Sequence, residues 1–136
     1  MSDSIAMSVL GPIATSELGM TLMHEHVFND CSCWWRGHEP DYQSDMMHKK
    51  VDSSMQKELT EDPFGCLDNC SNDNEELAIK ELLAVFSNGG RTLVDPTCRG
   101  IGRDPEALVR VSKATGLNII MGAGYYLHTS HPPELS

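Results

Sequence analysis

Residues 91–121 read RTLVDPTCRGIGRDPEALVRVSKATGLNIIM and decide the fold, because a strand, a helix and a second strand follow one another there. The apolar run Arg91–Asp95 predicts a short strand that stops at an acid. Asp104 as the N-cap and Pro105 at the first helical position predict the start of a helix. Residues 117–121 are mostly apolar and predict the next strand. A helix between two apolar strands indicates parallel neighbours joined by a right-handed crossover.

The segments upstream extend this pattern. Residues 72–74 offer N-caps for a helix that begins with two acids and ends at residues 88–90. Residues 20–26 predict an earlier strand, and residues 7–14 predict a hairpin or flap that leads into it. The order strand, irregular stretch, helix, strand, helix, strand predicts an α/β fold with a parallel sheet. The apolar stripe of the first helix consists of Leu77, Leu82, Leu83 and Phe86.

Two histidines stand at the end of the first strand. Side chains alternate across a strand, so His24 and His26 project from one face, where two imidazoles can converge on one cation. Ligands of parallel sheets collect at the carboxyl ends of the strands, where Asp95 and the turn at residues 122–126 also fall. This convergence favours a metal site over the alternative, two histidines that simply end a strand.

Composition excludes several classes of protein. The 136 residues suffice for one domain, and the net charge of −10 argues against binding to nucleic acid or to an anionic membrane surface. No apolar run approaches the length of about 18 to 20 residues that a membrane span needs. Five cysteines in a chain without a recognisable secretion signal indicate reduced thiols. We therefore expect a cytoplasmic protein without a membrane or nucleic-acid partner.

Residues 31–73, called the excursion below, are irregular in composition. Within them, residues Gln43 to Leu59 could hold a helix of modest quality, and His38 and His48 are expected at the surface. The excess of acids between residues 58 and 79 is typical of a solvated face.

Two familiar motifs are incomplete in this chain. The pairs Gly100-x-Gly102 and Gly122-x-Gly124 lack the third glycine of a dinucleotide-binding fingerprint, so they indicate tight turns instead. A four-thiolate zinc site would need pairs spaced by about 2 to 4 residues, and one of the two cysteine pairs is too tight for it. We therefore expect free thiols at Cys31, Cys33, Cys66 and Cys70.

Aromatic residues near the strand ends are candidates for a substrate pocket. Trp34 and Trp35 could wall such a pocket or could pack the excursion onto the sheet. Tyr125, Tyr126 and His128 follow the third strand and are candidates for the pocket rim.

At this point the chain resembles a known family. Residues 9–13 (VLGPI) and 19–26 (GMTLMHEH) closely resemble the opening of the phosphotriesterase family of the amidohydrolase superfamily. Residues 90–97 (GRTLVDPT), 100–104 (GIGRD) and 115–126 (TGLNIIMGAGYY) resemble its second and third βα units in the same order. The excursion matches only loosely.

The resemblance implies a TIM barrel with a pair of divalent ions, usually zinc, bridged by hydroxide. It implies hydrolysis of phosphotriesters, lactones or related esters, with a small molecule of this kind as the substrate. His24 and His26 match the first-strand metal ligands, and Trp34, Tyr125 and Tyr126 are the proposed pocket walls.

The chain departs from the family in its extent. A closed barrel needs eight strands and about 250 residues, and a catalytic zinc usually has three protein ligands. Asp95, His128 or His131 could add a ligand, although their spacing does not require it. We therefore expect residues 1–136 to be the N-terminal portion of a single TIM (β/α)8 barrel domain, with about three βα units and no turnover by itself.

Two other functions stay open from the sequence alone. One is a non-catalytic remnant or interaction module that associates through an open sheet edge, which allows a homodimer. The other is a small zinc-binding domain that uses the cysteines.

Overall fold

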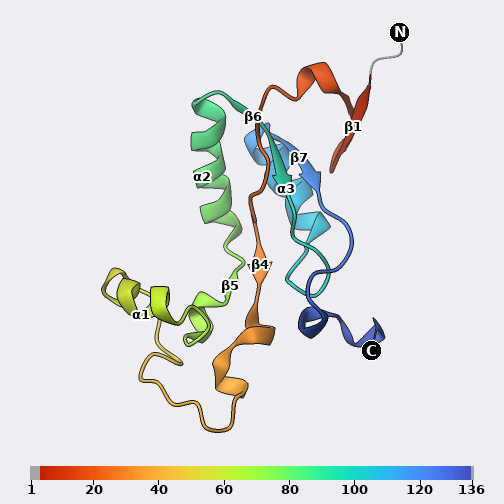
Figure 1. Ribbon diagram of the computed structural model, residues 1–136. Helices are drawn as coiled ribbons and strands as arrows, with labels where there is room; N and C mark the ends of the chain where they lie inside the picture. The colour runs from red at the N-terminus through yellow and green to blue at the C-terminus, as the bar shows by residue number, and fades with distance from the viewer. Residues whose placement is uncertain (1–3, 136) are drawn as a thin grey trace.

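Three parallel strands form the central sheet of the molecule (Figure 1). The computed structural model describes residues 4–135. The strands are β3 (Met20–Leu22), β6 (Gly90–Asp95) and β7 (Asn118–Met121), and they lie in the order β3-β6-β7. Both pairings are parallel, which confirms the crossover topology predicted from the alternation of strands and helices.

The two helices that connect these strands begin and end at the residues that the sequence indicates. Helix α2 (Glu75–Ser87) begins after Asn74, whose side chain accepts a hydrogen bond from the Leu77 amide at 3.0 Å. Helix α3 (Pro105–Thr115) begins after Asp104, which accepts from the Ala107 amide at 2.9 Å. Gly116 ends α3 in the left-handed conformation, with φ of 76°.

The main core lies between the sheet and the helices. Its most buried members, each at most 1% exposed, are Leu93 of β6, Ile119 of β7, Leu108 and Val111 of α3, and Leu117. The stripe predicted on α2 is wrong in part, because Leu82 is buried but Leu77, Leu83 and Phe86 are exposed. The face that packs on the core is rotated from the predicted one and consists of Ala78, Ile79, Leu82 and Val85.

A hairpin precedes the sheet. Strands β1 (Ile5–Ser8) and β2 (Gly11–Ala14) pair in antiparallel register, as residues 7–14 led us to expect. The Val9 amide then donates to the Ile119 carbonyl of β7 at 2.8 Å, so the hairpin rests on the edge of the sheet.

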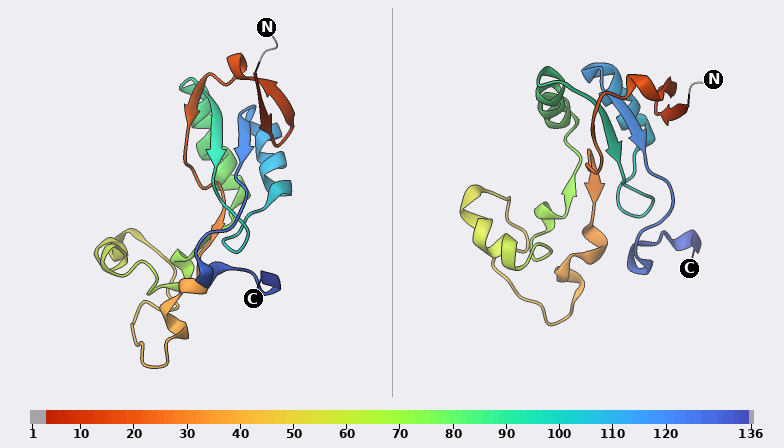
Figure 2. Two further views of the ribbon diagram at one scale, coloured as in Figure 1. Left: turned by 45° about the vertical axis from the view of Figure 1, so that its right-hand side comes forward. Right: turned by 45° about the horizontal axis from the view of Figure 1, so that its top comes forward.

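The excursion occupies the other end of the molecule, beyond the carboxyl ends of the strands (Figure 2). It leaves through β4 (Asn29–Asp30) and returns through β5 (Ser71–Asn72), which pair in antiparallel register. Its own small core joins Met46 and Met55 to Cys66.

The helix predicted between Gln43 and Leu59 is mostly absent. A 3-10 turn begins at Ser53, and only α1 (Gln56–Glu61) is α-helical. Asp52 is extended, with φ of −140°, and its carboxylate accepts from the Ser54 amide at 2.8 Å. A residue with this geometry starts a helix and cannot lie inside one. Among residues 4–135, none of the helices combines the length and the hydrophobicity of a membrane span.

Candidate functional site

The two histidines of the predicted metal site follow directly after β3. The strand is shorter than expected, since β3 ends at Leu22 and the chain bends at residues 23–24. The Glu25 amide still donates to the Val94 carbonyl at 3.0 Å, which keeps the chain alongside β6. At Val27 the amide donates to the Asp95 side chain instead of a main-chain carbonyl, at 3.2 Å, and regular pairing has ended.

The rings of His24 and His26 lie close together, with centroids 5.4 Å apart and planes at 74°. Both residues are exposed, and both line the same cavity. A zinc–nitrogen bond is about 2.0–2.1 Å long, so two imidazoles at a tetrahedral angle on one ion have ring centres roughly 5.2 Å apart. The observed separation fits one cation shared by the two rings.

Asp95 is not free to act as a third ligand. The side chain is 1% exposed, and its Oδ1 accepts from the Thr97 amide at 2.7 Å while Oδ2 takes the Val27 bond. The carboxylate therefore ties the loop after β3 to the loop after β6. Asp95 therefore stabilises the loop that carries the two histidines.

His128 and His131 lie with one another rather than with the histidine pair. Their ring centroids are 5.5 Å apart, and the His131 ring also lies 5.6 Å from that of Tyr125. In the part of the chain that the structure describes, no cluster of three or more His, Cys, Asp or Glu side chains is arranged to hold a metal ion. The described residues thus supply a pair of imidazoles, which is fewer than the three protein ligands of a usual catalytic zinc.

A cavity of about 810 Å³ opens beside the histidine pair, where the strand ends, the excursion and the segment after β7 meet. Trp34 forms one wall, with its ring centroid 5.9 Å from those of both Phe64 and Tyr126. The Trp34 indole donates from Nε1 to the Thr129 hydroxyl at 2.8 Å, which fixes the ring across two segments distant in sequence. The lining of the cavity contains no Lys, Arg, Asp or Glu side chain. It consists of His24, His26, Asn29, Cys31, Trp34, Phe64, Pro96, Ile101, Tyr126 and Leu127.

The other aromatic candidates separate from this cavity. Trp35 packs between His38 and His48, at centroid distances of 5.2 and 5.3 Å, and belongs to the excursion. Both of these histidines are exposed, as expected. Tyr125 does not line the cavity, and its ring lies beside Arg99 and His131.

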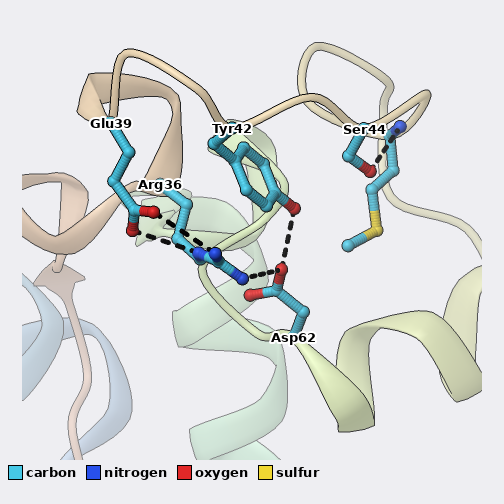
Figure 3. A network of polar contacts seen from close by, with 6 residues as sticks. Arg36, Glu39, Tyr42, Ser44 and Asp62 are labelled. Carbon is cyan, nitrogen blue, oxygen red and sulfur yellow. Dashed lines mark hydrogen bonds and ion pairs between the residues drawn. The ribbon is translucent and has the colours of Figure 1, made fainter.

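Phe64 also lines the cavity, and no local sequence pattern indicates it. A polar network within the excursion holds the turn that carries it, and Figure 3 shows the side chains of this network. The Arg36 amide donates to the Phe64 carbonyl at 2.9 Å, and the Arg36 guanidinium contacts Asp62 at 3.0 Å and Glu39 at 3.1 Å. Tyr42 donates its hydroxyl to Asp62 at 2.7 Å, and this hydrogen bond to a carboxylate raises the pKa of Tyr42. The network holds the turn at residues 62–65 against the start of the excursion.

All five cysteines are free, as expected from their number and spacing. Cys66, Cys70 and Cys98 are buried, and Cys31 is half-buried at the cavity wall. Burial, reinforced by neighbouring thiols, raises the pKa of Cys70 to about 11. A thiol with that pKa stays protonated at neutral pH and is a poor metal ligand and nucleophile.

Comparison with known proteins identifies the family. The model of the phosphotriesterase family matches residues 5–135. The chain belongs to the phosphotriesterase family. It is 37% identical to the N-acetyltaurine hydrolase of Tetraodon nigroviridis over 93% of this chain and 36% of that protein. It spans little more than a third of the length of the curated relatives that it matches.

Solved structures agree with this assignment. A resiniferatoxin-binding protein from Rhodobacter sphaeroides is 48% identical, with a TM-score of 0.87 over 96% of this chain and 36% of that one. A lactonase from Listeria monocytogenes is 25% identical, with a TM-score of 0.64 over 97% of this chain and 33% of that one. The fold is thus a portion of the TIM barrel of this family, as the sequence led us to expect.

Proposed function

We propose that this chain forms part of a metal-dependent hydrolase in which His24 and His26 hold a divalent cation, with zinc as the expected ion. The observation that carries the proposal is the pair of rings 5.4 Å apart at the wall of an 810 Å³ cavity. Membership in the phosphotriesterase family and similarity to a lactonase and to N-acetyltaurine hydrolases support hydrolytic chemistry.

A bound cation would acidify a water molecule and polarise the carbonyl or phosphoryl oxygen of a substrate. The chain's own residues have two tasks. The histidines hold the ion with neutral ring nitrogens, and the aromatic wall of Trp34, Phe64 and Tyr126 binds the substrate and excludes bulk water. Tyr125 stands outside this wall and would act only at the rim.

The lining of the cavity favours an uncharged substrate. It contains no Lys, Arg, Asp or Glu, so within this part of the site nothing pairs with a charged group on the ligand. An ester or a lactone with an apolar substituent fits such a lining. Similarity to a resiniferatoxin-binding protein also supports a site for an organic small molecule.

We also propose that residues 1–136 act as the first part of one barrel domain, in which the excursion at residues 31–73 supplies a pocket wall. Two imidazoles do not complete a catalytic site, so turnover depends on ligands from further strands, and those ligands would also hold a second ion. The net charge of −10 argues against a nucleic-acid partner or an anionic membrane surface. The free thiols accord with a cytoplasmic location.

The alternative, association through an open sheet edge, has one observation against it. The bond from Val9 to Ile119 places the hairpin on the edge of β7, so part of that edge is already occupied. The opposite edge, at β3, is where a homodimer would form, and the mass in solution tests for it.

Isothermal titration of metal-free protein with zinc tests the proposed site. We expect one ion to bind the wild-type chain and the affinity to fall at least about tenfold in the double variant His24→Asn/His26→Asn. The matched control is His38→Asn/His48→Asn, which removes two exposed histidines of the excursion and should bind zinc like the wild type. Equal affinity in all three proteins would rule out the histidine pair as the site.

A further inference from the structure

The hydroxyl of Thr97 lies between the ring of His26 and the main chain of the same loop. Thr97 Oγ1 is 2.8 Å from His26 Nδ1 and 3.0 Å from the carbonyl oxygen of Phe28. Thr97 is 2% exposed, so its hydroxyl is shielded from solvent, whereas the His26 ring is exposed. The inference below rests on the proposed function, in which His26 is a metal ligand.

The number of protons available decides the direction of each bond. A hydroxyl has one proton to donate, and a carbonyl oxygen can only accept. The Thr97 hydroxyl therefore donates to Phe28, and its oxygen accepts from His26. His26 must then carry its proton on Nδ1, and the lone pair of the neutral ring is left on Nε2.

Thr97 is itself held in place by β6. Its amide donates to the Asp95 carboxylate at 2.7 Å, and Pro96, with its fixed φ, links the two residues. The branched Cβ of threonine restricts χ1, so the hydroxyl has few alternative directions. The other Asp95 oxygen binds the Val27 amide, next to His26 in the chain. Through Asp95, strand β6 thus holds both the loop that carries His26 and the Thr97 hydroxyl to which His26 donates.

His24 provides an internal contrast. Within residues 4–135, no hydrogen bond reaches its ring, so nothing selects one of its two neutral tautomers before a ligand binds. Of the two rings, only that of His26 has its tautomer selected before a ligand binds.

We propose that Thr97 is a positioning residue that holds His26 in the Nδ1–H tautomer and presents Nε2, on the side of the ring away from Thr97, to a cation. Asp95 assists by fixing Thr97. Neighbouring partners of this kind typically change metal affinity by about 10-fold to 100-fold when they are removed.

Nitrogen-15 NMR of the histidine-labelled, metal-free chain tests the proposal without any activity assay. In spectra recorded at about pH 8.5, protonated and unprotonated ring nitrogens have well-separated shifts. We expect His26 to show a protonated Nδ1 and an unprotonated Nε2. We expect Thr97→Val to lose this preference and Thr97→Ser, which retains the hydroxyl, to keep it, with the His24 shifts unchanged in both.

A His26 ring protonated on Nε2 in the wild type would overturn the proposal, whether or not either variant folds. An unchanged His26 tautomer in folded Thr97→Val would also overturn it. Zinc titration of the same samples separates this proposal from the proposed function. Failure of zinc to shift the Nε2 resonance of either ring, with the tautomer as expected, would contradict metal binding and leave the role of Thr97 intact. With zinc bound, we expect its affinity for Thr97→Val to fall about 10-fold or more.

Discussion

Within residues 4–135, Asp95 is the only hydrogen-bond acceptor of two buried main-chain amides, and replacement by alanine removes it. These are the amides of Thr97 and Val27, at 2.7 and 3.2 Å from the carboxylate oxygens. A buried donor without an acceptor costs about 1–3 kcal/mol. The second bond, at 3.2 Å, is longer than the first and contributes less. We therefore expect Asp95→Ala to lower the free energy of unfolding by about 3 kcal/mol.

Urea denaturation followed by circular dichroism measures this loss. With an m-value of about 2 kcal/mol per molar, the midpoint should fall by about 1.5 M. The matched control is Asp45→Ala, an exposed aspartate of the excursion, which should change the free energy of unfolding by less than about 0.5 kcal/mol. Hydrogen exchange should also accelerate at the amides of Thr97 and Val27 well before it does at Leu108. An Asp95→Ala variant as stable as Asp45→Ala would refute the role assigned to the carboxylate.

Three further outcomes follow from the structure. In thermal unfolding, Gly102→Ala should destabilise the protein by roughly 2 kcal/mol or more, because φ is +91° and an added Cβ would lie 2.5 Å from a main-chain nitrogen of β4. Gly124→Ala, where φ is +98° but the surrounding space is open, should cost roughly 1 kcal/mol. Iodoacetamide at about pH 8 should label the exposed Cys33 and spare Cys70, whose pKa is raised to about 11, and peptide mass spectrometry checks the order. A hydrogen bond from an arginine of α3 lowers the pKa of Glu75, so the pair stabilises the fold above the ordinary pKa of glutamate. This stabilisation is lost as the pH falls through the lowered pKa, and the unfolding midpoint of Glu75→Gln should therefore depend less on pH in that range.

The sequence predicted the regular part of the fold because local chemistry marks it. Asp104, Pro105 and Gly116 define α3 through capping geometry that depends only on neighbouring residues. The apolar residues of β6 and β7 identify buried parallel strands for the same reason. The stripe predicted on α2 passes through the leucines, whereas the face that packs on the core also includes the smaller Ala78.

The structure of the excursion is not predictable from local sequence, because long-range polar contacts determine it. The turn that carries Phe64 is held by Arg36 and Asp62, which are 26 residues apart. The proximity of Trp34 to the cavity likewise depends on a bond to Thr129, 95 residues away. No local pattern distinguishes Trp34 from Trp35, although one lines the cavity and the other packs inside the excursion.

In the candidate site, too, some residues are predictable from local sequence and others only from long-range contacts. His24 and His26 are recognisable from a strand pattern and from the resemblance to the family. The supporting roles of Asp95 and Thr97 require knowledge that the two strand ends lie side by side, which the parallel pairing of β3 and β6 establishes. Asp95 could be read as a ligand from its position at a strand end, and only its buried bonds to two amides show otherwise.

X-ray absorption at the zinc edge tests the central claim most directly, because it identifies the atoms bound to the ion. For the zinc-loaded wild-type chain we predict a shell of nitrogen and oxygen atoms at about 2.0–2.1 Å with the multiple scattering of two imidazoles, and no such imidazole signal in His24→Asn/His26→Asn. A sulfur shell at about 2.3 Å, or an imidazole signal that persists in the double variant, would contradict the claim that this histidine pair binds the metal.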